Sequence, residues 1–347
     1  MKILIVGMGG IGQRHVRNLR TLLGNDIEII AYRVRRLIIA VSEKLEVEAG
    51  VDVEKKYSVR VFNDLDEALA QNPDIAFVCN PSSLHIPLAI RIAEQGCHLF
   101  IEKPLSHNNE NVEKLASIIK QKNLVSLIGY QMRFHPCIQK LKSVIDCNRI
   151  GKILAVRAQV GEYLPAFHKY EDYRQMYASK KELGGGVVLS QIHELDYLYW
   201  FFGLPLRIFA LGGHLSSLEI DVEDIASVLM EFKYQDAIFP VHLHMDFVQR
   251  PPSRTCDIIG DKGRVNVDIN ANTVKVFGDD GYILEESSFK NFNRNQMFLD
   301  ELNHFLSCIQ NNQKSIVTIQ DGMQSLRMAL IIKKSIQTGR IIQVGDF

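Results

Sequence analysis

Short apolar runs alternate with helical patterns along the first third of the chain. Between the runs, apolar residues recur at helical spacing, as at Val16, Leu19 and Leu23. The runs cover residues 3–6, 27–32, 59–62, 74–79 and 98–102, with a sixth at 124–129. Such alternation is typical of a parallel sheet wound with helices on both faces. The pattern therefore predicts an α/β domain of the Rossmann type.

The pattern changes from about Gly151 onward. Leu154, Val156, Ala158 and Val160 alternate with more polar neighbours, which predicts a long strand. Further strand-like runs, separated by short turns, cover residues 226–232, 237–247, 255–259, 264–268 and 273–277, and helical patterns cover 295–310 and 320–338. Short turns between strands are typical of antiparallel hairpins. We predict an α+β second domain with a large, mostly antiparallel open sheet and helices on one face.

The length of the chain favours two domains, because 347 residues are more than one compact core usually holds. We place a Rossmann dinucleotide-binding domain at residues 1–123 and a substrate-binding and oligomerisation domain at residues 124–347. An open sheet with one uncovered face needs a partner. We therefore expect a homodimer or a homotetramer that associates through the second sheet.

Composition excludes several classes of partner. The 40 basic and 40 acidic residues cancel, so neither nucleic acid nor an anionic membrane surface is indicated. We expect no signal peptide, because the first strand starts at the amino terminus, and no apolar run approaches the length of a membrane span. The six cysteines lack paired spacing, which favours reduced thiols and a cytoplasmic protein.

A metal site has weak support. His242, His244 and Asp246 alternate along one predicted strand and therefore share a face, a spacing that can ligate a metal. No further ligand is placed beside them by the sequence. We therefore expect no metal, and that face is open to a substrate or a subunit contact instead.

A glycine turn follows the first strand directly. Gly7, Gly9 and Gly12, with Gly10 and Ile11 between them, lead from that strand into a helical pattern. In a dinucleotide site the first glycine permits a tight turn, the second lets the backbone approach a pyrophosphate, and the third allows close helix packing. The context predicts a cofactor cradle, with a glycine-rich turn that binds no ligand as the alternative.

The end of the second strand bears on the choice of cofactor. An NAD site usually places an acid about twenty residues past the last glycine, where it binds the ribose hydroxyls. Here Arg33 holds that position, and Arg35 and Arg36 follow it. Guanidinium groups suit a 2′-phosphate, so we predict NADP in preference to NAD. A solvated loop of arginines is the alternative.

Taken together, the motifs resemble the Gfo/Idh/MocA oxidoreductases over nearly the whole chain. The motifs are the glycine turn and residues 78–85, 102–104, 129–136 and 184–193. The resemblance implies a two-domain enzyme that uses NAD or NADP to oxidise or reduce a hydroxyl-bearing carbon of a sugar, an inositol or a nucleotide sugar. The residues that it places at the cofactor are Asn80, Pro81, His85, Glu102 and Lys103.

Lys103 and His193 are the candidate catalytic residues. Hydride transfer from a carbinol leaves an alkoxide-like oxygen, which needs a proton acceptor and a nearby positive charge. Lys103 follows a predicted parallel strand, and His193 lies in a pattern that is apolar on most faces and so predicts a buried helix. The alternatives are a surface lysine and a core histidine that only makes hydrogen bonds.

One departure from the family lies just before His193. Many members carry an aspartate there, whereas residues 189–192 of this chain contain no carboxylate. Ser190 can hydrogen-bond a substrate hydroxyl, and Asp196 could orient His193 from the same helix face. The departure keeps a second function open, that of a catalytically silent sensor that binds cofactor and ligand.

The substrate is expected to be a small sugar-type molecule. Residues 161–177 are dense in aromatic and charged side chains, which suits recognition of a polyol. Besides Ser190, the candidates for substrate contact are Tyr163, His168, Tyr173 and Arg174 in this segment and Tyr130 and Arg133 after the sixth strand. A loop that packs on itself or on a neighbouring subunit is the alternative.

Overall fold

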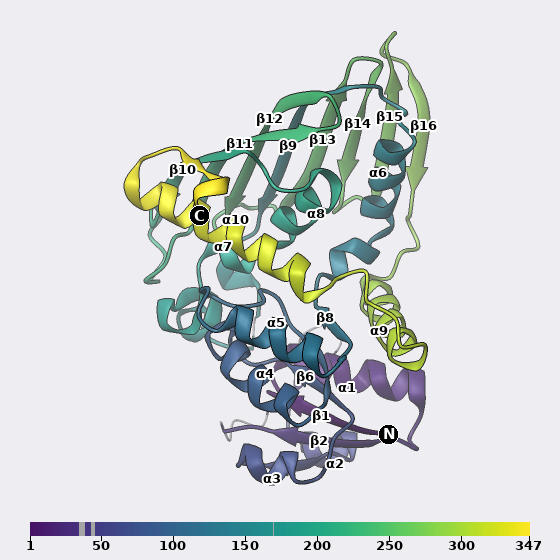
Figure 1. The fold of residues 1–347 in the computed structure, drawn as a ribbon, viewed down its shortest axis with the longest axis vertical. Helices are drawn as coiled ribbons and strands as arrows, with labels where there is room; N and C mark the ends of the chain where they lie inside the picture. Colours follow the sequence, from purple (N-terminus) through teal and green to yellow (C-terminus); the bar gives the residue numbers. More distant parts are fainter. Residues whose placement is uncertain (35–38, 43–45, 169) are drawn as a thin grey trace.

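The computed structural model describes residues 1–34, 39–42, 46–168 and 170–347. Two sheets dominate it, and helices of the second part of the chain lie between them (Figure 1). In the described residues, the first sheet has six parallel strands in the order β5-β2-β1-β6-β7-β8. Their bounds are β1 Lys2–Val6, β2 Glu28–Tyr32, β5 Arg60–Phe62, β6 Ile75–Val78, β7 His98–Ile101 and β8 Ser126–Ile128. The predicted Rossmann-type domain is confirmed.

Helices cover this sheet, and their starts follow local sequence signals. The helices are α1 Gly10–Leu23, α2 Val53–Tyr57, α3 Leu65–Leu69, α4 His85–Glu94 and α5 Val112–Gln121, and a small hairpin pairs β3 Ala40–Val41 with β4 Val47–Glu48. Asp64, for example, caps α3 by accepting the backbone N–H groups of Asp66 and Glu67. The buried strands are almost wholly apolar because both of their faces are covered.

The second sheet has nine strands in the described residues, in the order β16-β15-β14-β13-β9-β12-β11-β10-β17. The strands are β9 Ile153–Gly161, β10 Arg207–Gly213, β11 Ile225–Tyr234, β12 Ala237–Asp246, β13 Ser253–Gly260, β14 Gly263–Asp268, β15 Thr273–Gly278, β16 Ile283–Ser288 and β17 Ile342–Gln343. The sheet is mixed, because β9 runs parallel to β12 while the other paired neighbours are antiparallel. The predicted large, mostly antiparallel sheet is confirmed.

Helices pack on one face of the second sheet. α6 Pro136–Asp146 packs on β14 and β15, α8 His193–Phe202 on β9 and β11, and α10 Ile319–Thr338 on β10 (Figure 1). In the described residues, the other face of the sheet carries no helix at strands β10, β11 and β12. There the apolar side chains of Leu211, Leu229 and Ile238 are exposed. The sheet is therefore open on that side in the single chain.

Two helices of the second part return to the first domain. α9 Arg294–Gln310 packs on α1, and α10 packs on β8. Gly322 of α10 sits so close to β8 that a Cβ there would be 2.9 Å from Cγ1 of Ile128. β8 itself belongs to the first sheet, so that sheet continues past the predicted boundary at residue 123. β8 belongs to the first sheet because it pairs in parallel with β7 as the last strand of that sheet.

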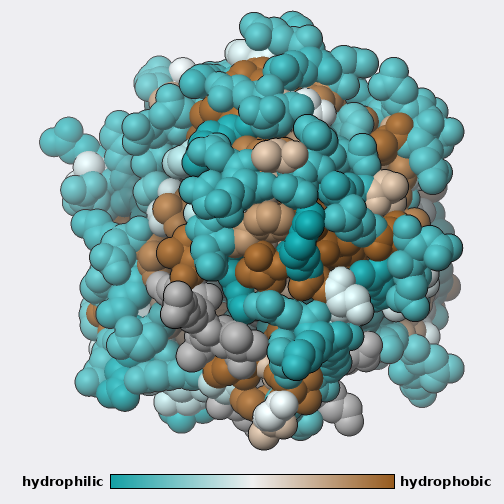
Figure 2. Space-filling model, turned by 90° about the horizontal axis from the view of Figure 1, so that it is seen from below, coloured by the Kyte–Doolittle hydropathy of each residue, from teal (hydrophilic) through white to brown (hydrophobic). Residues whose placement is uncertain are grey.

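The surface around the first domain is mainly hydrophilic. Seen from below, polar side chains surround a middle zone in which apolar side chains are interspersed with polar ones (Figure 2). No helix in the described parts of the chain combines the length and the apolar character that crossing a bilayer requires.

Candidate active site

The glycine turn between β1 and α1 has the geometry of a dinucleotide cradle. Gly7 has φ of +96°, and a Cβ on it would lie 3.0 Å from the backbone nitrogen of Asn80. A Cβ on Gly12 would lie 2.1 Å from the carbonyl oxygen of Gly7, so the close approach of α1 requires glycine. Gly9 has open space within 4 Å of its Cβ position. The turn and the amino end of α1, formed by Gly10 and Ile11, thus fit a pyrophosphate.

Gln13 holds this turn in place, and the sequence patterns did not identify it. Its buried side-chain amide donates to the carbonyl of Met8 at 3.1 Å and accepts from the backbone N–H of Val41 at 2.8 Å. It therefore ties the cradle to β3. The sequence signal for this role is that Gln13 is a polar residue on the buried face of α1.

Arg33 lies at the end of β2, as predicted, but it already has an acidic partner. Its guanidinium forms an ion pair with Glu54 of α2, and the Arg33 side chain is mostly buried. Arg35 and Arg36, which the sequence grouped with it, lie outside the described residues. The ion pair compensates part of the positive charge that a 2′-phosphate would use.

His85 joins two loops at the carboxyl ends of the strands. Its Nε2 lies 2.7 Å from the carbonyl oxygen of Asn80, and its Nδ1 lies 2.9 Å from that of Pro104. The ring is buried, and burial lowers its pKa. Asn80 Oδ1 is buried and, among the described residues, lacks a partner, whereas Pro81 directly precedes a short helical turn. His85 thus positions the loop that carries Asn80 and Pro81.

Glu102 closes the strand end beside the cradle. Its Oε1 lies 2.7 Å from Nε2 of His15 in α1, and its Oε2 accepts the backbone N–H of Lys103 at 3.3 Å. Gly129 leaves room for this carboxylate, because a Cβ there would be 3.1 Å from Oε2. The sequence patterns did not identify His15, which follows the glycine turn by a single helical turn. The pair fixes the carboxylate at the mouth of the cradle.

Lys103 reaches across the domain junction. Its ammonium donates to the backbone carbonyl of Ser190, with Nζ 2.7 Å from the oxygen. Ser190 ends the short helix α7 Val187–Ser190, and its buried hydroxyl has no hydrogen-bond partner in the described part of the chain. The contact brings the Lys103 charge to the segment that leads into His193.

His193 begins α8 and is buried beside Tyr130 and Gln131. Its Nε2 lies 3.2 Å from the side-chain nitrogen of Gln131, and the Tyr130 ring meets it edge-on with centroids 5.9 Å apart. Burial lowers the pKa of His193 well below 6.5, and the positive charges of Lys103 and Arg254 lower it further. The imidazole is therefore neutral near pH 7. Within the described residues, its Nδ1 is buried without a partner.

Asp196 is not the partner of His193. Its carboxylate binds Arg133 through two hydrogen bonds, Nε to Oδ2 at 2.9 Å and Nη2 to Oδ1 at 2.7 Å. Arg133 also donates to the carbonyl of Ile316 at 2.9 Å and lies 3.3 Å from Asp321. Both members of the pair are fully enclosed. The Arg133 guanidinium is therefore engaged by the protein itself, and residues 189–192 leave the position before His193 without a carboxylate.

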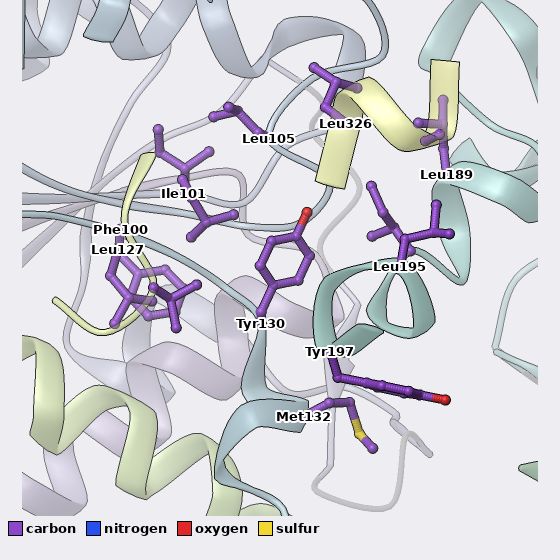
Figure 3. Close-up of a cluster of buried hydrophobic side chains, with 14 of the residues drawn as sticks. Phe100, Ile101, Leu105, Leu127, Tyr130, Met132, Leu189, Leu195, Tyr197 and Leu326 are labelled. Carbon is purple, nitrogen blue, oxygen red and sulfur yellow. The ribbon is translucent and has the colours of Figure 1, made fainter. Parts of the chain in front are cut away.

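Tyr130 lies in the core between the two domains. Its ring is fully buried among Ile101 and Leu105 of the first domain and Leu195 and Leu326 of the second, with its hydroxyl directed toward the side of Leu326 (Figure 3). The cluster holds β7, α8 and α10 together behind the Lys103 contact. Tyr130 therefore supports the site from behind.

The aromatic segment 161–177 makes many contacts of its own. His168 Nδ1 lies 2.7 Å from Glu171, and the Tyr173 hydroxyl accepts the backbone N–H of Glu219 at 3.2 Å. The Arg174 guanidinium binds Asp172 and Glu219, and the Tyr163 ring lies under Arg250, whose guanidinium carbon is 4.1 Å from the ring centroid. Their roles toward a substrate stay predictions.

The alternating His242, His244 and Asp246 lie on β12, as predicted. His244 Nε2 is 3.4 Å from Asp246 Oδ2, and both imidazoles approach the Ser227 hydroxyl. Across the described ranges, no three His, Cys, Asp or Glu side chains are grouped so that they could hold a metal ion.

Two family models match the chain. The first, described as an oxidoreductase family with an NAD-binding Rossmann fold, matches residues 1–130, and the GFO/IDH/MocA C-terminal domain matches residues 138–266. The chain belongs to the Gfo/Idh/MocA oxidoreductase family. It is therefore an oxidoreductase of that family, with an NAD-binding Rossmann domain.

Relatives match over the full length. A myo-inositol 2-dehydrogenase of Thermotoga maritima is 26% identical, with 100% of this chain and 99% of the relative covered. A scyllo-inositol 2-dehydrogenase (NAD(+)) of Bacillus subtilis is 21% identical, with 99% and 96% covered. Among solved structures, scyllo-inositol dehydrogenase of Lactobacillus casei, with bound NAD(H) and scyllo-inositol, has a TM-score of 0.77, 26% identity and 99% coverage of both chains.

Proposed function

We propose that this oxidoreductase transfers a hydride between NAD(P) and a hydroxyl or keto carbon of a sugar or sugar derivative, with Lys103 and His193 assisting proton transfer. The observation that supports this most strongly is the contact across the domain junction. There Lys103 Nζ lies 2.7 Å from the Ser190 carbonyl, three residues before a neutral, buried His193. The relatives with named activities include inositol dehydrogenases.

The bound nicotinamide would accept or donate the hydride. Around it, the ammonium of Lys103 stabilises negative charge that develops on the substrate oxygen. The neutral imidazole of His193 accepts the hydroxyl proton and returns it in the reverse direction. The free hydroxyl of Ser190 binds a neighbouring substrate hydroxyl. Glu102, fixed by His15, orients the strand end that carries Lys103.

Five residues of the second part of the chain are proposed to contact the substrate. Ser190, Tyr163, His168, Tyr173 and Arg174 remain the proposed contacts for a small sugar-type molecule. For Tyr130 and Arg133, burial in the core and in the Asp196 ion pair favours a supporting role behind the site. We propose no nucleic-acid, membrane or metal partner.

For the cofactor, we propose that Arg33 favours NADP by binding the 2′-phosphate, in competition with Glu54. Replacing Arg33 with alanine should weaken NADPH binding about tenfold or more and leave NADH binding nearly unchanged, because charge-assisted hydrogen bonds are lost from one ligand alone. Replacing Glu54 with glutamine should strengthen NADPH binding, because it frees the guanidinium. Titration of reduced-nicotinamide fluorescence measures the affinities of the wild type and of both variants for NADPH and for NADH. Equal binding of both cofactors by the wild type would contradict the proposal.

We propose that the open face of the second sheet mediates self-association into a homodimer or homotetramer. The exposed side chains of Leu211, Leu229 and Ile238 form an apolar surface that a second copy would cover. Light scattering should give a multimeric mass for the wild type and a smaller one for Leu229→Lys. A monomeric wild type would contradict this.

We further propose a cytoplasmic location. All six cysteines are free thiols and five of them are buried, which suits a reducing compartment. Cell fractionation would test it.

The second candidate function, a silent sensor, is favoured by one observation. The segment before His193 carries no carboxylate, and Asp196 is engaged by Arg133. Turnover of NAD(P) with a panel of sugars and inositols separates the two functions. Turnover supports the oxidoreductase, whereas tight binding of cofactor and sugar without turnover supports the sensor.

A further inference from the structure

The side chain of Gln131 contacts His193, the proposed acid–base residue, directly. The amide nitrogen of Gln131 lies 3.2 Å from Nε2 of the imidazole, and both residues are buried. Gln131 begins the short helical turn η2 Gln131–Phe134, which follows β8, and His193 is the first residue of α8. Which ring nitrogen of a histidine carries hydrogen is set by the hydrogen bond that the other nitrogen makes.

A second contact between η2 and α8 holds this geometry. Two residues past Gln131, Arg133 binds the carboxylate of Asp196, one helical turn past His193, through two hydrogen bonds of 2.9 and 2.7 Å. The Arg133 guanidinium also donates to the carbonyl of Ile316 at 2.9 Å. The buried pair therefore fixes η2 against α8 and keeps Gln131 beside His193.

The contact with Gln131 assigns the hydrogen of the imidazole ring. An amide nitrogen only donates hydrogen bonds, so Nε2 of His193 must accept through its lone pair. Burial and the charge of Lys103 keep the ring neutral near pH 7 by lowering its pKa, so the ring carries one hydrogen. That hydrogen is therefore on Nδ1, which is buried and has no hydrogen-bond partner among the described residues. In this state neither ring nitrogen has a free lone pair for a proton.

The amide of Gln131 is able to reverse this assignment. Its two ends have nearly the same size and opposite roles, because the amide oxygen only accepts. The contact with His193 is the single hydrogen bond of the Gln131 side chain in the described part of the chain, so a half-turn of the amide breaks no other bond. The imidazole is less free to turn, because it is enclosed and the Tyr130 ring meets it edge-on, with centroids 5.9 Å apart.

We propose that Gln131 is a positioning residue that sets the tautomer of His193, and that its amide turns to make the histidine a base. With the amide oxygen toward Nε2, the ring hydrogen lies on Nε2 and the lone pair of Nδ1 is free. The substrate hydroxyl then transfers its proton to Nδ1, while the Nε2 hydrogen stays bonded to the amide oxygen. In the reverse direction the same proton leaves Nδ1 for the substrate oxygen. This inference rests on the proposed hydride-transfer function and assigns the atom of His193 that carries the proton.

Nitrogen NMR of the full-length protein, labelled at its histidines, reads the tautomer directly near pH 7, because protonated and unprotonated ring nitrogens have well-separated shifts. The His193 signals are assigned by their loss in His193→Asn. In the wild type without substrate, Nδ1 should carry the hydrogen. In Gln131→Glu, whose carboxylate only accepts, Nε2 should carry hydrogen. Gln131→Met forms no hydrogen bond to the ring, so it should lose the preference for one tautomer.

Turnover gives a second readout. Gln131→Met should lower kcat about tenfold and change KM much less, because the loss of one hydrogen bond to His193 acts on proton transfer and not on substrate affinity. The matched control is Gln121→Met, at the exposed end of α5, which should behave as the wild type in both measurements.

Three results would overturn the inference: hydrogen on Nε2 in the wild type without substrate, the same tautomer in the wild type and in Gln131→Met, or full kcat in Gln131→Met. Failure of the proposed function gives a different pattern, namely the expected tautomers in all variants with no turnover of any sugar. In that case the tautomer assignment stands, and the proton transfer to Nδ1 is overturned together with the function.

Discussion

Replacing Lys103 with methionine should lower kcat about 10³-fold. The ammonium contacts the segment before His193, where Nζ lies 2.7 Å from the Ser190 carbonyl oxygen. Methionine keeps a long unbranched side chain but removes both the positive charge and the proton donor. Groups that stabilise a developing oxyanion or transfer a proton contribute about 10²–10⁴-fold each.

The experiment compares steady-state turnover and cofactor titration for the wild type, Lys103→Met and Lys103→Arg. Arginine keeps the charge but does not release a proton, so it should recover only part of the rate if Lys103 also moves protons. Lys122→Met, at the exposed end of α5, is the matched control and should behave as the wild type. A methionine variant with nearly full kcat would remove Lys103 from the mechanism.

Much of the first domain could be predicted because its strands are buried on both faces. Apart from the first residue of β1 and of β7, the strands β1, β6 and β7 are apolar, and the predicted Gly7, Asn80 and Lys103 lie within two residues of their ends. In the second sheet, the sequence patterns do not predict β10, β16 or the two-residue strand β17. β10 ends in two glycines, and most of β16 is exposed or half-exposed, so neither shows a clean period of two.

The contacts that complete the site could not be predicted, because they join residues far apart in sequence. Arg133 and Asp196 are 63 positions apart, and the contact between Arg14 and Asn295 spans 281. Each residue alone is compatible with a surface position, and only the packing of α9 and α10 on the first domain brings the partners together. For the same reason Asp196 was assigned to His193, its neighbour on α8, instead of to Arg133.

Removing the charge of Asp196 should destabilise the protein strongly. In Asp196→Asn, Arg133 keeps its charge in a fully buried position and loses its two-bond carboxylate partner, with only the longer contact to the partly exposed Asp321, at 3.3 Å, remaining. Breaking a buried ion pair from one side costs about 3–5 kcal/mol, mostly because the remaining charge is left without compensation. The pair lies at the junction of β8, α8 and α10, so the midpoint of thermal unfolding should fall by several degrees in calorimetry.

The matched control is Glu231→Gln, which opens an exposed pair with Arg207 that has the same two-bond geometry, at 3.0 and 2.8 Å. An exposed pair contributes about 0–1 kcal/mol, so this variant should unfold close to the wild type. A double variant, Arg133→Met with Asp196→Leu, removes both charges and should recover much of the loss, because no buried charge then remains unpaired. If Asp196→Asn unfolds no earlier than Glu231→Gln, the buried pair does not hold the two domains together.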